Sequence, residues 1–175
     1  MTEDAHQFWA FSLRFYGIPR VRDACLLLQD EAALNVNLVL WCCWKAAQGK
    51  ELSHGDLRAA AGRIEEWSRT VTRPLRTLRR RVKAELGDDD MHTARHGLYE
   101  RLKMAELEAE RVEQALLCRA AATGSSPLAA GGARLLARSN LETYMEIADT
   151  RGNPENRQRL SAELAQLLAG ADPLP

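Results

Sequence analysis

The 175-residue sequence has few β-branched apolar residues, no excess of either charge and no long apolar run. It contains six valines and three isoleucines against 27 alanines and 26 leucines, a composition that favours helices over strands. Its 24 basic and 24 acidic residues argue against a strongly charged polymer-binding protein, and its 46% hydrophobic content excludes intrinsic disorder. We therefore predict an all-α protein.

Several classes of protein lack their usual sequence signals. The longest apolar run covers residues 38–44, far short of the ~20 residues that cross a bilayer, so no membrane span is predicted. The start, MTEDAHQFW, lacks the layout of a secretory signal, and we expect a cytoplasmic protein. The four cysteines lack the spacing of zinc and redox motifs, and we expect them to be reduced packing residues. Phosphate-binding loops and the common hydrolase motifs are missing, so no cofactor and no catalytic residue is expected.

Hydrophobic periodicity and capping signals predict a single-domain bundle of about six to eight helices over residues 1–175, with a core at about residues 6–170 and polar termini. Asn35 is a predicted N-cap for Val36–Ala47, which is apolar on nearly every side and belongs at the centre. Ser53 with Asp56 resembles a capping box. Pro74 either kinks one long helix or starts a new one.

The second half of the chain predicts three more helices. Apolar residues spaced 4, 3, 4, 3 and 4 apart form the seam of a long helix that we place at the centre of the bundle: Leu98, Leu102, Ala105, Ala109, Val112 and Leu116. Ser139 and Glu142 resemble a capping box that starts another helix, and Asn153 with Pro154 marks a last amphipathic one.

A basic stretch over residues 69–83 is the first candidate site. On a continuous helix, Arg73, Arg76, Arg80 and Lys83 would share one face with Arg69, and this face could bind a protein partner, RNA or another polyanion. The alternative is an internal match, because an acidic stripe on the long helix has the same spacing: Glu106, Glu110 and Glu113. Both alternatives remain open at the level of the sequence.

His92 and His96 form a weak candidate metal site. With Glu100 they recur every four residues and would share a helical face, which is a feasible arrangement for a transition metal. The further ligands would have to come from elsewhere, so we expect no metal.

An N-terminal block of aromatic and polar residues is the third candidate site. Seven of the ten aromatic residues lie in the first 44 positions, with polar groups among them. A structural interpretation is that these amides and carboxylates tie helix ends to neighbouring backbone. The functional interpretation is a ring-lined pocket for a small molecule or a partner's side chain. Its candidate residues are Trp9, Gln29, Asp30, Asn37, Trp41 and Trp44.

Five segments stand out together: FWAFSLRFY, ACLLLQD and VNLVLWCCW, followed by PLRTLRRRVK and KMAELEAERVEQ. Over roughly residues 6–120 they resemble a small proteobacterial family of all-helical proteins with a domain of unknown function. It implies a helical fold and carries over no cofactor or catalytic residue.

Together these observations favour a non-enzymatic binding or adaptor protein that uses the basic face for a macromolecular partner. A small-molecule-binding protein or enzyme, with an aromatic-lined pocket near Gln29 and Asp30, is the alternative. The sequence sets no oligomeric state.

Overall fold

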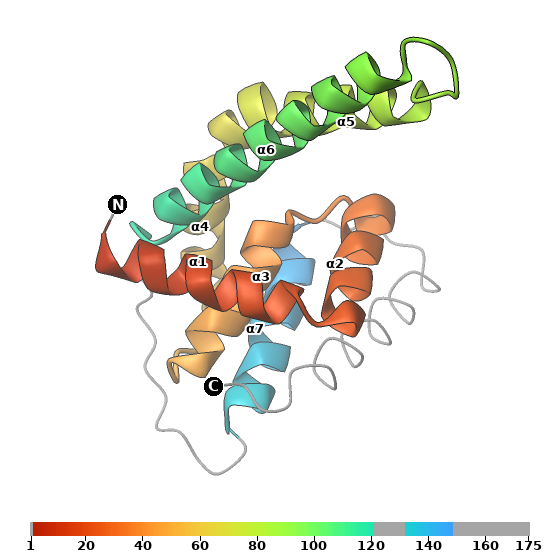
Figure 1. Cartoon of the computed structure of the whole chain (residues 1–175). Coiled ribbons are helices and arrows are strands. Elements are labelled where there is room, and N and C mark those ends of the chain that lie inside the picture. The colour runs from red at the N-terminus through yellow and green to blue at the C-terminus, as the bar shows by residue number, and fades with distance from the viewer. Residues whose placement is uncertain (1, 121–131, 149–175) are drawn as a thin grey trace.

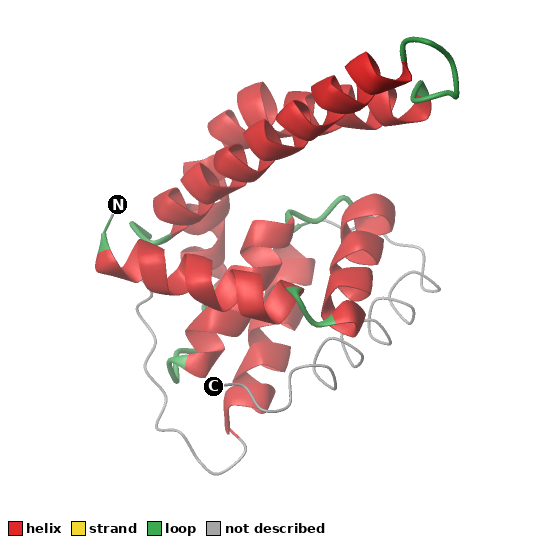
Figure 2. Ribbon diagram, viewed as in Figure 1, coloured by secondary structure: helices red, strands yellow, loops and turns green. Residues whose placement is uncertain are grey.

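The computed structural model describes residues 2–120 and 132–148, which are helical and contain no strand (Figure 2). Seven α-helical segments follow one another along the chain (Figure 1). They are α1 (Glu3–Tyr16), α2 (Pro19–Ala32), α3 (Val36–Ala47), α4 (His54–Trp67), α5 (Arg73–Ala84), α6 (His92–Leu117) and α7 (Gly132–Ile147). The prediction of an all-α fold is confirmed. The helix predicted after Pro154 lies outside the described residues.

Helix α3 lies at the centre of the core, as its apolar sequence predicts. Its residues 37–46 are all buried, and it packs most extensively against α7 while also contacting α1, α2 and α6. The Asn35 side chain accepts hydrogen bonds from the backbone N–H groups of Asn37 and Leu38, at 2.8 and 3.3 Å, and so caps the helix. All four cysteines are free thiols.

Helix α7 is fastened to the centre by one buried amide. Asn140 is fully buried, and its Oδ1 accepts from the Leu52 N–H at 2.7 Å. Its Nδ2 donates to the backbone oxygens of Cys42 and Lys50, at 3.2 and 3.1 Å. The predicted capping box at Ser139 and Glu142 is wrong, because both residues lie inside α7.

Helices α4 and α5 join through a π-helical segment, Ser68–Thr72, into one continuous helix. The segment ends two residues before Pro74, which has no N–H to continue an α-helical ladder. After α5 the chain turns back, and α6 packs against α5. The two helices form an antiparallel hairpin, here called the arm (Figure 1). No residue of α5 is buried, and the arm extends past α1, α2 and α3.

The face of α6 that packs inward differs from the predicted seam. Leu98 and Val112 are 45% and 39% exposed, whereas Leu102 and Ala109 are buried. The buried face of α6 includes polar residues as well: Leu102, Glu106, Ala109, Glu113, Gln114 and Leu117. The rotation of the helix brings acidic side chains inward, where arginine and asparagine side chains meet them. In the described ranges, no helix is long and apolar enough to span a membrane.

Candidate functional site

A cleft of about 340 Å³ lies between the arm and the first three helices. Helices α1, α2 and α3 form one wall, and α5 and α6 form the other. Its volume falls at the small end of the range of ligand pockets in proteins. Most of the lining is apolar, contributed by Trp9, Leu13, Leu26, Val36, Leu40, Met104 and Leu107.

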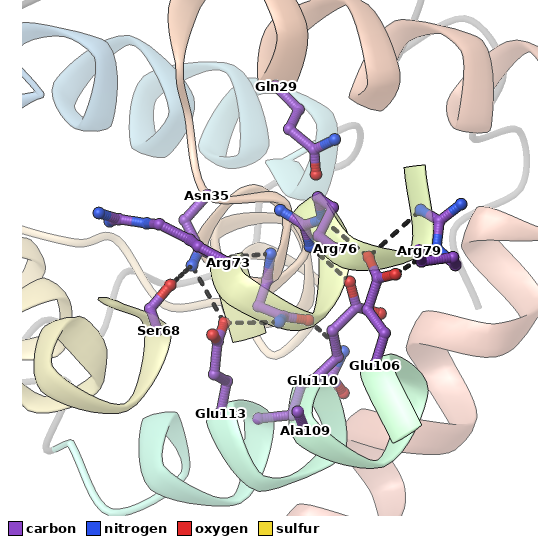
Figure 3. Close-up of polar contacts among 12 residues, drawn as sticks. Gln29, Asn35, Ser68, Arg73, Arg76, Arg79, Glu106, Ala109, Glu110 and Glu113 are labelled. Atoms are coloured by element: carbon purple, nitrogen blue, oxygen red, sulfur yellow. Dashed lines mark hydrogen bonds and ion pairs between the residues drawn. The ribbon is translucent and has the colours of Figure 1, made fainter. Parts of the chain in front are cut away.

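Two arginines of α5 share one carboxylate of α6 inside this cleft (Figure 3). Arg76 Nε donates to Glu106 Oε1 at 2.8 Å, and Arg79 Nε donates to Glu106 Oε2. Burial of Glu106 would raise its pKa, but the hydrogen bonds from Arg79 and Arg76 outweigh this and hold the pKa below its usual value. Glu106 is therefore an ionised, nearly buried carboxylate.

Glu110 lies one turn further along α6 and has a different protonation behaviour. Its Oε1 accepts from Arg76 Nη2 at 2.7 Å. Burial raises the pKa of Glu110 to about 7, because the charges of Glu106 and Glu113 add to the desolvation and Arg76 offsets only part of it. A carboxyl group in a cleft that exchanges a proton near neutral pH is a common feature of functional sites.

Arg80 joins the two walls of the cleft. Its Nη2 donates to Asp30 Oδ1 of α2 at 2.6 Å, and the two side chains are 49% and 50% exposed. The hydrogen bond from Arg80 lowers the pKa of Asp30. Gln29, which lines the cleft, also donates to Asp30, at 3.3 Å.

Amide side chains at the start of α3 meet Glu113 of α6 at the other end of the cleft (Figure 3). Asn35 and Asn37 both donate to Glu113 Oε2, at 3.0 and 2.8 Å, and Gln114 Nε2 donates to Asn37 Oδ1 at 2.9 Å. Ser12 and Gln114 also line the cleft, and they are 3% and 2% exposed. Within the described part of the chain, Ser12 Oγ and Gln114 Oε1 have no hydrogen-bond partner. Buried polar atoms without partners are uncommon, and a bound ligand is one explanation for them.

The residues of the predicted basic face point in different directions. Arg76 is turned inward onto Glu106 and Glu110, with only 19% of its side chain exposed. Arg73 pairs with Glu65 at 3.0 Å and is 54% exposed. Lys83 is exposed. One residue of the basic face, Arg76, thus pairs within the protein with Glu106 and Glu110, which are two of the three glutamates of the acidic stripe.

The six predicted pocket residues divide into two groups. Trp9, Gln29 and Asn37 line the cleft, and Asp30 lies beside it through Arg80. Trp41 and Trp44 are buried in the core instead, where Trp44 stacks on Phe8 with ring centroids 4.9 Å apart.

The two histidines lie at the start of α6. His92 Nδ1 is within 2.8 Å of the Leu86 and Gly87 backbone oxygens, and the His92 and His96 rings are 6.1 Å apart. No group of three or more histidine, cysteine, aspartate or glutamate residues that could hold a metal occurs in the part of the chain that the structure describes.

Sequence reasoning missed most of the apolar lining of the cleft and several of its polar residues, among them Ser12, Arg79, Tyr99, Lys103 and Gln114. Trp9, Ser12, Leu13 and Tyr16 share one face of α1 at 3- and 4-residue spacing, and this periodicity was a usable signal. Nothing local marks Gln114, because its position depends on the rotation of α6.

A family model described as "Protein of unknown function (DUF2390)" matches residues 7–117. The chain belongs to the DUF2390 family. The DUF2390 match begins in α1 and ends with α6, so it contains every residue that lines the cleft. Helix α7, which covers α3 on the other side, follows the region matched by DUF2390. No curated protein and no solved structure matches the chain.

Proposed function

We propose that this DUF2390 protein binds a small organic molecule in the cleft between the arm and helices α1 to α3. One observation carries the proposal. Ser12 and Gln114 line the cleft, and their buried Ser12 Oγ and Gln114 Oε1 atoms have no partner among the described residues. Leaving such groups unsatisfied costs about 1–3 kcal/mol each, and a ligand with matching polar atoms removes that cost.

The apolar residues at the cleft support the same conclusion. Leu13, Leu26 and Met104 are 53%, 39% and 53% exposed although they are large and apolar. They belong to three different helices, α1, α2 and α6, and all line the cleft. A ligand with an apolar body would cover these side chains.

Ligand-observed NMR with neutral, cationic and anionic fragments tests the proposal on the full chain. Met104→Trp fills the cleft and is expected to abolish binding of the hits. Leu98→Trp is the matched control, since Leu98 is a similarly exposed apolar residue of α6 that does not line the cleft. Fragments that bind the wild type and both tryptophan variants equally would place the ligand elsewhere. A screen without hits would contradict the proposal.

A second candidate function follows from the outward part of the basic stretch. Arg73 and Arg80 are about half exposed and Lys83 is exposed, so an acidic protein surface or an RNA could contact them. Quantitative pull-down compares the wild type with an Arg80→Glu/Lys83→Glu variant, and Arg58→Glu on α4 is the control. Identical captured sets would contradict this candidate. For duplex RNA, log affinity must fall with log salt by about 0.9 per neutralised phosphate.

A further inference from the structure

We propose that the ligand of the cleft is an amphipathic anion. Its acidic group lies against Arg79 and Arg80, its apolar body covers Trp9 and Met104, and a hydroxyl or N–H group at its far end reaches Ser12 and Gln114. This assignment rests on the proposed function, since it names the class of ligand that the same cleft takes.

The charges that line the cleft favour an anion. Four lining residues are basic and two are acidic: Arg76, Arg79, Arg80 and Lys103 against Glu106 and Glu110. Arg79 pairs with Glu106, and Arg76 pairs with Glu106 and Glu110, which still leaves N–H groups on both guanidinium groups for another acid. The partner of Arg80 is the half-exposed Asp30, and such a pair exchanges readily for a ligand.

The far end of the cleft selects a hydrogen-bond donor. The Nε2 group of Gln114 is committed to Asn37, which leaves Gln114 Oε1 as an acceptor. Ser12 Oγ can donate or accept. An O–H or N–H group at this end of a ligand would satisfy the Gln114 oxygen, whereas a plain hydrocarbon end would leave it unpaired.

The two ends are separated along α6. Glu106, which holds Arg79, and Gln114 are eight residues apart, and a helical rise of 1.5 Å per residue separates them by about 12 Å. The wall between them contributes Leu107, and the facing wall contributes Trp9 and Leu13. A ligand that reaches both ends therefore needs an apolar spacer, such as a substituted aromatic ring with a short chain.

Four probes with the same carbon skeleton separate these features. They are 4-(4-hydroxyphenyl)butanoate, its amide, the corresponding 4-(4-hydroxyphenyl)butylamine, and 4-phenylbutanoate, which lacks the hydroxyl group. We expect the hydroxyphenyl acid to bind the full chain at pH 7 at least about tenfold more tightly than the amide and the amine, because charge-assisted hydrogen bonds are the stronger ones. It should also bind more tightly than 4-phenylbutanoate.

Substitutions locate each end. Arg80→Gln should weaken binding of the acid by about tenfold and leave binding of the amide unchanged. Arg81→Gln is the matched control, because Arg81 neighbours Arg80 on the same helix but is 79% exposed and pairs with Glu85. Ser12→Ala removes a hydroxyl without a partner, so it should fold normally and reduce the preference for the hydroxyphenyl acid over 4-phenylbutanoate.

The outcomes distinguish this inference from the proposed function. Equal or tighter binding of the amide or the amine overturns the anionic class and leaves the cleft as a site for another ligand. The same holds if no probe binds while the fragment screen gives hits that Met104→Trp abolishes. If neither the probes nor the fragments bind, both proposals fail.

Discussion

Arg80 of α5 and Asp30 of α2 form an ion pair of 2.6 Å that links the arm to the opposite wall of the cleft. The chain segments on either side of this pair are 50 residues apart in sequence. Both side chains are about half exposed, so the pair is accessible to solvent and to any charged ligand that enters the cleft.

Replacing Asp30 by asparagine distinguishes the contribution of this ion pair to stability from its effect on ligand binding. Exposed ion pairs contribute about 0–1 kcal/mol, so Asp30→Asn should change the free energy of unfolding by less than about 1 kcal/mol. The freed Arg80 should bind 4-(4-hydroxyphenyl)butanoate more tightly, as measured by titration calorimetry. Asp23→Asn is the control, because Asp23 is an exposed acid of the same helix that pairs with its neighbour Arg22. Equal affinities in both variants would contradict the role given to Arg80.

Glu106 is expected to be the most important acidic residue for stability. Glu106→Gln leaves the guanidinium groups of Arg76 and Arg79 largely buried without their shared carboxylate, and removing one partner of such a pair costs about 3–5 kcal/mol. Urea denaturation measures the loss. Glu108→Gln is the control, since Glu108 is 64% exposed on the same helix. A loss no larger than that of Glu108→Gln would show that the shared carboxylate does not stabilise the arm.

Glu110 should make stability depend on pH between about 4.5 and 7. Its pKa is about 7 in the folded protein, so between its unfolded value of 4.5 and 7 the folded state binds more protons than the unfolded state. Stability from this group is therefore full below pH 4.5 and falls as the pH rises to 7. Its surroundings are Arg76, Glu106, Glu113 and Tyr16.

The variant Glu110→Gln should flatten this slope. Comparing the midpoint of urea unfolding at pH 5, 6, 7 and 8 for wild type and variant gives the contribution of Glu110 directly. The lowered pKa of Glu106 acts in the opposite direction, because its stabilisation is lost only as the pH falls below its unfolded value of 4.5. An unchanged slope in Glu110→Gln would contradict the raised pKa.

Asn140 should be essential for the attachment of α7. Asn140→Ala removes the partner of the Leu52 N–H and of the Lys50 carbonyl, and each buried group left unsatisfied costs about 1–3 kcal/mol. We expect a loss of about 2–4 kcal/mol in the free energy of unfolding. Arg138→Ala on the exposed side of α7 is the control and should have little effect. Similar losses in both variants would contradict the assignment.

A glycine at position 33 should stabilise the protein. Ala33 is the C-cap of α2 and adopts a left-handed conformation, with φ of 54° and ψ of 24°. This conformation costs a non-glycine residue about 1–2 kcal/mol, whereas glycine adopts it freely at a smaller entropic cost. Ala33→Gly should raise the free energy of unfolding by about 0.5–1 kcal/mol. Ala59→Gly, inside α4 and exposed, should lower it by about 1 kcal/mol. A loss in both variants would contradict the strain at Ala33.

Local signals predicted several of the helices and their ends, but not the site. The apolar run of α3, its cap at Asn35 and the capping box at Ser53 follow from residues that are close in sequence, and the structure confirms each of them. The rotation of α6 about its axis does not follow from residues that are close in sequence. Apolar periodicity places Leu98 and Val112 inside, but burying Glu106 against two arginines and Glu113 against two asparagines turns a different face inward.

The cleft was only partly predictable for the same reason. The sequence singled out Trp9, Gln29 and Asn37, which belong to the aromatic and polar N-terminal block and line the cleft. The facing wall comes from α5 and α6, more than 60 residues away from Trp9. The ion pairs of Arg76 and Arg79 with Glu106 hold these two helices together. Such long-range pairs leave no local pattern.

The π-helical segment Ser68–Thr72 determines the azimuth of the arginines that follow it. A π-turn holds one residue more than an α-helical turn, and each residue of an α-helix turns the chain by about 100°. The same residues in α-helical geometry would turn the chain by roughly a further quarter turn and carry Arg76 and Arg79 away from Glu106, whereas deleting one residue would largely preserve their azimuth. The wider π-turn therefore sets which side of the helix faces inward on each side of it: α4 faces the core, and α5 faces α6.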